Sequence, residues 1–319
     1  MMKNDYLERI LAARVYDVAV ETPLEVAPNL SARLGNRLLL KREDMQPVFS
    51  FKCRGAYNKM VNLPPAALSR GVIASSAGNH AQGVALAAQK LACAATIVMP
   101  STTPKIKVDA VRARGGEVVL HGDTYDEAYA QARQLEKARK LAFVHPYDDP
   151  RIMAGAGTST LELLDEAGAL DLVVIPAGGG GQLSGGAVAA SGLVQAPRVV
   201  GVEPAAVGQW RASLAAGRPV HVEVGSTIAD GQQLPSPGNL TFAVVKALVE
   251  DVVSVRDEQL LAAMRYLFER QKLVTEPSGS SALAAVLSGL VDVRGLRVGV
   301  ILSGGNIAVD RFNTLLSSG

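Results

Sequence analysis

Short runs of consecutive apolar residues recur along the chain and predict strands that are buried on both faces. The predicted strands are Arg37–Lys41, Gly71–Ser75, Ala95–Met99, Glu117–His121, Ala142–Val144, Leu172–Pro176, Arg198–Val202, Val252–Val255 and Arg297–Leu302. Several carry Val and Ile side by side, without the polar alternation of a half-exposed strand. This is typical of a parallel sheet that helices cover on both sides.

The segments between these strands show the spacing of helices. Thr124 and Glu127 fit a capping box, in which each side chain accepts a hydrogen bond from a backbone N–H at the helix start. One face of that predicted helix holds Ala128, Ala132, Leu135 and Ala138, and one face of a later helix holds Leu260, Met264, Leu267 and Phe268. The alternation of strands and helices predicts right-handed βαβ units and therefore an α/β protein.

Four loops that follow predicted strands hold small or polar residues. They are residues 75–80 (SSAGNH), 178–181 (GGGG), 202–204 (VEP) and 303–306 (SGGN). Because ligands of open α/β sheets bind beyond the carboxyl ends of the strands, we expect the chemistry of this protein in these loops.

The composition argues against several classes of partner. The chain holds 32 Lys and Arg against 30 Asp and Glu, with no long run of one sign, which disfavours nucleic acid and anionic membranes. No apolar run is long enough to span a bilayer, and the first residues lack the apolar core of a signal peptide. Cys53 and Cys93 are isolated in the sequence, so we expect free thiols in a cytoplasmic protein.

The glycines Gly178, Gly179, Gly180 and Gly181 stand between a predicted strand and a predicted helix. Their backbone N–H groups can approach a phosphate closely, and a helix N-terminus adds positive potential. The plain alternative is a flexible turn. A dinucleotide site is a further alternative, because Glu203 follows at a suitable distance, but neither register supplies the third glycine of that motif. One phosphate therefore fits this loop better than a pyrophosphate.

Lys52 lies among the apolar residues Phe49, Phe51 and Cys53. A lysine is usually a solvated surface charge. However, an apolar environment lowers the pKa of the amine and frees its lone pair for Schiff-base chemistry, and this neighbourhood permits such a role.

Other polar residues have both a structural and a functional interpretation. Asn79 and His80 either cap the next helix or, with Ser76, help to hold a carboxylate. Ser303 either caps a turn or contacts a ligand, and Glu276 before Pro277 is consistent with a helix start.

Taken together, these segments resemble the threonine/serine dehydratases, or threonine deaminases, of the tryptophan-synthase-β-like group of pyridoxal-phosphate enzymes (fold type II). The resemblance runs from near Tyr6 to about Asn306. Its motifs, in order, are residues 40–44 (LKRED), 50–56 (SFKCRGA), 76–83 (SAGNHAQG), 178–181 (GGGG) and 303–306 (SGGN). Five motifs in one order are far more specific than any single glycine loop.

The resemblance implies a role for each motif. Lys52 would form the Schiff base with pyridoxal 5'-phosphate and act as general base, and Ser303 would meet the pyridine nitrogen. The other implied cofactor contacts are Phe51 against the ring, Asn79 at the 3-oxygen, Gly178, Gly179, Gly180 and Gly181 at the phosphate, and Glu276 near the ring. The implied substrate loop, which would grip the carboxylate, consists of Ser76, Ala77, Gly78, Asn79 and His80.

Some positions depart from the family pattern. Serine racemases of this group have a serine at the position of Ala77, so we expect little racemisation, since a methyl group cannot carry a proton. Glu203 is present, but Val207 and Gln209 occupy the stretch in which cation-binding relatives have a second carboxylate, so we expect no metal.

The predicted function is α,β-elimination, which converts L-threonine or L-serine to 2-oxobutanoate or pyruvate and ammonia. Gln182 stands where a leucine or methionine is usual, and Ala156 where many dehydratases have glutamine. Dehydration of another β-hydroxy amino acid, such as phenylserine or hydroxyaspartate, therefore stays open. From other classes, a nicotinamide-dependent oxidoreductase and a binding protein without activity are the alternatives.

The resemblance also implies two doubly wound α/β domains with the cofactor in the cleft between them. A large domain of residues 1–49 and 149–319 would contain a small domain of residues 50–148 as an insertion. We expect a homo-oligomer, either a dimer or a tetramer. Biosynthetic members of the family carry a further domain that senses isoleucine, and since the sequence ends soon after Ser303 we expect no such feedback.

Overall fold

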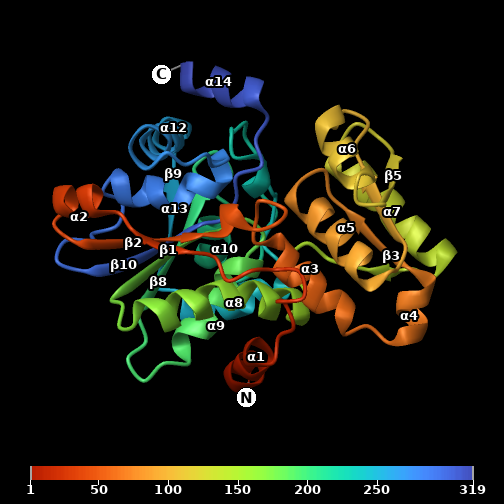
Figure 1. Ribbon diagram of the computed structural model, residues 1–319, viewed down its shortest axis with the longest axis horizontal. Coiled ribbons are helices and arrows are strands. Elements are labelled where there is room, and N and C mark those ends of the chain that lie inside the picture. Colours follow the sequence, from red (N-terminus) through yellow and green to blue (C-terminus); the bar gives the residue numbers. More distant parts are fainter. Residues whose placement is uncertain (1, 318–319) are drawn as a thin grey trace.

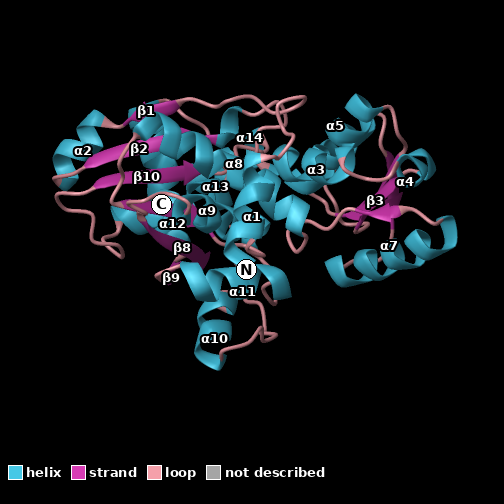
Figure 2. Ribbon diagram, turned by 90° about the horizontal axis from the view of Figure 1, so that it is seen from below, coloured by secondary structure: helices cyan, strands magenta, loops and turns pink. Residues whose placement is uncertain are grey.

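The computed structural model describes residues 2–317 and contains two sheets of mostly parallel strands (Figures 1 and 2). The larger sheet has the strand order β1-β2-β10-β7-β8-β9, in which β1 runs antiparallel to β2 and all other neighbours are parallel. Its strands are β1 (Leu24–Val26), β2 (Arg37–Arg42), β7 (Leu172–Pro176), β8 (Arg198–Pro204), β9 (Asp251–Val255) and β10 (Arg297–Leu302). The smaller, all-parallel sheet has the order β5-β4-β3-β6, with β3 (Val72–Ser75), β4 (Ala95–Met99), β5 (Glu117–Leu120) and β6 (Ala142–Phe143).

Helices cover both faces of each sheet. On the larger sheet, α2 (Pro28–Leu34), α12 (Asp257–Tyr266) and α13 (Pro277–Leu287) pack on one face, and α8 (Pro150–Ala167), α9 (Gly181–Ser191), α10 (Gln209–Ala216) and α11 (Asn239–Leu248) pack on the other. On the smaller sheet, α3 (Lys52–Val61), α5 (Asn79–Leu91) and α6 (Lys105–Arg112) lie opposite α7 (Tyr125–Arg139). The remaining helical segments are α1 (Met2–Leu11), α4 (Pro65–Arg70), α14 (Val309–Ser317), the single turns η1 (Glu43–Met45) and η2 (Asp230–Gln232), and the π-helical η3 (Leu267–Gln271).

Neighbouring residues of one strand enter opposite cores, which explains the unbroken apolar runs. In β7, Leu172 and Val174 pack in the core that contains α13, whereas Val173 and Ile175 pack in the core that contains α9. The prediction of a parallel α/β fold is confirmed, and β3, β4 and β7 are buried on both faces as predicted. The prediction was wrong for β5 and β6, which lie at the two edges of the smaller sheet and are only partly buried.

Each predicted strand is present, with its ends shifted by at most two residues. Strand β1 was not predicted; it has three residues and is only partly buried. So short a strand leaves no periodicity to detect, and it is defined by its antiparallel pairing with β2.

The capping box of α7 is confirmed, since Glu127 N donates to Thr124 Oγ1 at 3.3 Å and Thr124 N donates to Glu127 Oε2 at 3.0 Å. Two positions on the predicted helical faces were wrong. Ala138 is exposed, because the core beneath α7 ends at Leu135. Phe268 is 44% exposed because it lies in the π-helical segment η3, whose wider turn rotates it off the buried face and against Phe312 of α14.

Cys53 and Cys93 are both free thiols, as predicted. Among the helices within residues 2–317, none combines the length and the hydropathy that a membrane span requires.

Helices α8 and α9 touch backbone to backbone where Gly157 faces Gly185. A Cβ atom at Gly185 would overlap the carbonyl oxygen of Met153 and lie 2.8 Å from Gly157 N. This contact places the first turn of α9, which begins at Gly181, close to the end of β7.

Gly185→Ala is expected to lower the free energy of unfolding by about 2 kcal/mol, because α9 has to move away from α8. In an uncrowded helix the same change stabilises by roughly 0.5–1 kcal/mol, so the two cases differ in sign. Urea denaturation measures the effect, with Ser191→Ala at the half-buried end of α9 as control. Equal stability of the two variants would contradict the close approach of the helices.

Candidate active site

Loops from both sheets line one cavity of about 860 Å³. The residues that the sequence indicated for the site all lie on its wall: Phe51, Lys52, Ser76, Ala77, Gly78, Asn79, His80, Gly178, Gly179, Gly180, Gly181, Glu276 and Ser303. Three of the four predicted loops therefore meet in one place. The fourth, residues 202–204, does not contribute to the cavity wall within the described part of the chain.

Glu203 caps a helix, whereas in a dinucleotide site it would bind the ribose. Its buried carboxylate accepts hydrogen bonds from Trp210 N at 2.8 Å and Arg211 N at 3.2 Å, at the start of α10. A carboxylate that caps a helix in this way is not free to bind a ribose, and this geometry argues against the oxidoreductase alternative. Within residues 2–317, no group of three or more His, Cys, Asp and Glu side chains is arranged to hold a metal ion.

Lys52 is the first residue of α3. The backbone at residues 51 and 52 contacts both the loop after β10 and helix α5. Phe51 N donates to the carbonyl oxygen of Ser303 at 3.2 Å. On the other side, a Cβ atom at Gly83 of α5 would lie 3.0 Å from the carbonyl group of Lys52, so the helix packs directly against this backbone. The side chain lines the cavity, and its Nζ donates to Pro146 O at 2.7 Å.

Burial brings the pKa values of Lys52 and Glu276 close to each other. Burial lowers the pKa of Lys52 to about 8, against the opposing effect of the negative charge of Glu276. Burial raises the pKa of Glu276 to about 8, reinforced by Asp230 and opposed by the hydrogen bond from Asn79. Near neutral pH, Glu276 is therefore largely protonated, and a useful fraction of Lys52 carries a free lone pair.

The two histidines beside Lys52 stay neutral. Burial, with the positive charge of Lys52, lowers the pKa of His80 to about 3, and burial lowers the pKa of His145 to about 4. The ring of His80 is engaged through Nε2 with Val144 O at 2.8 Å. With its ring engaged in this way, His80 has its backbone N–H available to bind a ligand at the start of α5.

The glycine loop is built so that its carbonyl groups face away from the cavity. Gly178 O accepts from Trp210 Nε1 at 2.7 Å, and Gly179 O accepts from Thr241 Oγ1 at 2.8 Å. Neither donor belongs to the cavity wall. Since the C=O and the following N–H of a planar trans peptide point in opposite directions, the N–H groups of Gly179 and Gly180 face the cavity side. Together with the N-terminus of α9, they fit a phosphate group.

At two positions of this loop, neighbouring side chains leave no room for any residue larger than glycine. Gly180 has a φ of +97°, and a Cβ atom there would lie 2.5 Å from the Trp210 ring. A Cβ atom at Gly179 would overlap the Tyr147 ring. Tyr147 supports the loop and lines the cavity, yet nothing in the sequence marks it beyond the turn-rich stretch in which it lies.

The cavity also has residues that sequence reasoning did not identify. Asp230 and Gln232 lie in η2 within a long irregular segment, and Lys107 of α6 forms an ion pair with Asp230 at 3.0 Å. No periodicity or motif marks this segment. Only the folded chain shows that residues of this segment line the cavity.

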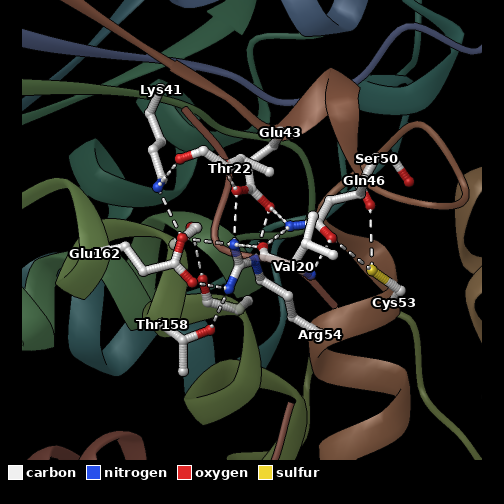
Figure 3. A network of polar contacts seen from close by, with 12 residues as sticks. Val20, Thr22, Lys41, Glu43, Gln46, Ser50, Cys53, Arg54, Thr158 and Glu162 are labelled. Atoms are coloured by element: carbon white, nitrogen blue, oxygen red, sulfur yellow. Dashed lines mark hydrogen bonds and ion pairs between the residues drawn. The ribbon is translucent and has the colours of Figure 1, made fainter. Parts of the chain in front are cut away.

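A buried network of charges surrounds Arg54, a residue of the same helix as Lys52 (Figure 3). Arg54, two residues further along α3, donates to Glu43 Oε2 at 2.7 Å and Oε1 at 2.9 Å. It also donates to Glu162 Oε1 at 2.5 Å and Oε2 at 2.8 Å, and Lys41 Nζ lies 2.7 Å from Glu162 Oε2. The network therefore joins α3 to β2, η1 and α8 of the larger sheet.

The network is complete and electrically balanced. Two cations face two anions, and further hydrogen bonds come from Thr22, Thr158, Gln46 and the carbonyl of Val20. Tyr16 also donates to Glu162 Oε1 at 2.8 Å. Burial would raise the pKa of Glu162, but the hydrogen bonds and the charge of Arg54 outweigh it, so that the pKa is lowered. Removing one partner would leave a charge uncompensated in the interior.

Residues 15–304 match the family model described as pyridoxal-phosphate dependent enzyme, and the chain belongs to this family. Within it, the chain is 42% identical to the L-threonine ammonia-lyase of Thermotoga maritima, over 95% of this chain and 75% of that protein. It is 45% identical to the biosynthetic L-threonine dehydratase of Burkholderia multivorans, over 98% of this chain. The chain spans 62% of the length of that second relative.

The solved structure of the processed form of threonine deaminase isoform 2 from Solanum lycopersicum superposes with a TM-score of 0.95. Its sequence is 42% identical, and the match covers 99% of this chain and 88% of that one. The predicted fold type II, the family and the pyridoxal phosphate cofactor are thereby confirmed.

Arg54→Lys is expected to lower the free energy of unfolding by about 3 kcal/mol, because lysine keeps the charge but cannot donate to both carboxylates. The exposed Arg294→Lys, which alters a pair with Asp292, is the control and should change stability by less than about 0.5 kcal/mol. Chemical denaturation compares them. A loss for Arg54→Lys no larger than that of the control would show that the network does not support the fold.

In the cofactor-free protein, the reaction of Lys52 with formaldehyde and cyanoborohydride should rise with pH around a midpoint near 8, because the neutral amine is the nucleophile. Glu276→Gln should move this midpoint to lower pH, since the opposing negative charge is gone. Mass spectrometry of the peptide that contains Lys52 follows the modification. A midpoint at the ordinary lysine value of 10.5 would contradict the proposed environment.

Proposed function

We propose that this chain is an ammonia-lyase that converts L-threonine to 2-oxobutanoate and ammonia, and L-serine to pyruvate and ammonia. The observation that carries this proposal is the convergence of Lys52, the four-glycine loop, Asn79 and Ser303 on one cavity. It is supported by the 42% identity to a protein named L-threonine ammonia-lyase, of which the chain covers 75%.

The residues around the cavity fit pyridoxal phosphate. The N–H groups of the glycine loop would hold its phosphate, Asn79 its 3-oxygen, Ser303 its pyridine nitrogen and Lys52 Nζ its aldehyde carbon. Phe51 and Glu276 would lie beside the ring. When bound, pyridoxal phosphate supplies an electron sink for the charge that develops as the substrate α-proton leaves.

Lys52 would hold and move the proton. With the substrate held in the cavity, the neutral amine of Lys52 would accept the proton from the substrate α-carbon. The lowered pKa suits this role, because a base with a pKa near the working pH is both unprotonated and basic enough. In the net reaction, one water is lost across Cα and Cβ and one water replaces the nitrogen, which leaves a 2-oxo acid and ammonia.

The start of α5 would hold the substrate carboxylate. α5 begins at Asn79, so the N–H groups of Asn79 and His80 have no acceptor within the helix, and they lie at its positive end. The N–H groups of Ser76 and Gly78 are already engaged, by Val98 O and Ser76 Oγ. The anion-binding groups of this loop are therefore the backbone N–H groups of Asn79 and His80. The neutral ring of His80 points to Val144 O instead.

A different β-hydroxy amino acid is the alternative substrate, and one observation supports this alternative. Gln182 borders the cavity, and neither its Nε2 nor its Oε1 has a hydrogen-bond partner within the described residues. An unpartnered buried amide costs about 1–3 kcal/mol, so a polar substrate group that satisfied it would bind better. Hydroxyaspartate carries a second carboxylate on Cβ that could accept from this amide, where threonine has a methyl group.

The proposal predicts that the purified protein with pyridoxal phosphate has a violet absorption band that borohydride removes. Lys52→Ala should lose the band, and the release of 2-oxo acid should fall by roughly a thousandfold or more. The exposed Lys90→Ala on α5 is the matched control and should keep both. A panel of threonine, serine, phenylserine and hydroxyaspartate identifies the preferred substrate. A wild-type protein without the band, or full activity in Lys52→Ala, would contradict the proposal.

A further inference from the structure

Three side chains from separate parts of the chain form a line of hydrogen bonds along the cavity wall. Asn306 lies in the loop after β10, Asn79 begins α5, and Glu276 precedes α13. Asn306 Nδ2 donates to Val48 O at 2.7 Å and to Asn79 Oδ1 at 2.7 Å. Asn79 Nδ2 donates to Glu276 Oε1 at 2.5 Å.

The carbonyl group of Val48, at one end of this line, determines which group donates and which accepts in each hydrogen bond. The carbonyl group of Val48 can only accept, so Asn306 must present its nitrogen to it, and the two hydrogens of that nitrogen go to Val48 and Asn79. Asn79 must then turn its oxygen toward Asn306 and its nitrogen toward Glu276. The opposite orientation of Asn79 would place two donor nitrogens face to face and would lose the hydrogen bond between Asn306 and Asn79.

The anchor of this line is itself well fixed. Gly305 N donates to Phe49 O at 2.9 Å, and Glu276 N donates to Gly304 O at 3.2 Å. The loop that carries Asn306 is thus tied to the segments on both sides of it. Asn79 begins α5, which packs on the smaller sheet, whereas Asn306 and Glu276 lie in loops of the larger sheet's part of the chain. The amide of Asn79 is therefore oriented by partners from the other sheet.

We propose that Asn306 is a positioning residue that holds the amide of Asn79 with its N–H side toward the cavity. The nitrogen of Asn79 carries two hydrogens, and Glu276 takes one, so the other is left for an acceptor oxygen of the ligand. The inference rests on the proposed function, in which this oxygen is the 3-oxygen of pyridoxal phosphate. Without Asn306, both orientations of the amide would be open, and one of the two would present an oxygen to an oxygen.

Asn306→Asp tests the inference, because a carboxylate of the same shape has no hydrogen for Val48 O or Asn79 Oδ1. Asn79 should then turn its nitrogen to the new carboxylate and its oxygen to the cavity. The dissociation constant of pyridoxal phosphate, measured by equilibrium dialysis with the cofactor-free protein, should rise roughly tenfold to a hundredfold. The maximum of the violet absorption should shift as well. The matched control is Asn313→Asp on the exposed side of α14, which should change neither.

Asn306→Ala removes the constraint without adding charge, and it should raise the dissociation constant less than Asn306→Asp does. It also keeps the test decisive if Asn306→Asp fails to fold. The inference is overturned if both folded variants bind pyridoxal phosphate with the wild-type affinity and absorption while Asn79→Ala does not. It is also overturned if the variants lose only thermal stability, which is the result of a purely structural role. A wild-type protein that binds no pyridoxal phosphate would instead contradict the proposed function.

Discussion

The paired contacts of Arg54 with Glu43 and Glu162 tie the first turn of α3 to the larger sheet, and the position of Lys52 depends on them. Arg54 and Lys52 are two residues apart in the same helical turn, so a shift of one moves the other. All the charges involved are buried, and each has an opposite charge within 2.9 Å. Such a network tolerates little movement, because a broken pair leaves a charge without water.

Several of the groups that line the cavity are fixed hydrogen-bond donors. The peptide N–H groups of Gly179 and Gly180, the starts of α5 and α9, and the side-chain nitrogen of Asn79 are all donors held by partners behind them. Because these donors are oriented before any ligand arrives, little reorganisation is needed when an anionic group binds. The cavity is therefore suited to a ligand that carries a phosphate, a carboxylate and a further acceptor oxygen.

Sequence reasoning was most accurate where local pattern and burial agree. Consecutive Val and Ile in β7 reflect two buried faces, and Thr124 with Glu127 forms a cap through contacts within one turn. It was wrong at Phe268, because a π-helical turn changes the spacing that the helical pattern assumes. It did not find Tyr147 or Asp230, since Tyr147 lies in a loop and Asp230 in a single 3-10 turn, and no motif marks either.

The sequence by itself determined the fold class, the loops at the strand ends and the residue types available for chemistry, because these follow from periodicity and from short motifs. Only the tertiary structure decided which way each polar group points. Glu203 became the cap of α10, the ring of His80 turned to Val144, and the amide of Asn79 took its direction from Asn306. The reason is physical: a hydrogen bond depends on partners that lie far apart in the chain, and their distance and direction exist only after the sheets have packed.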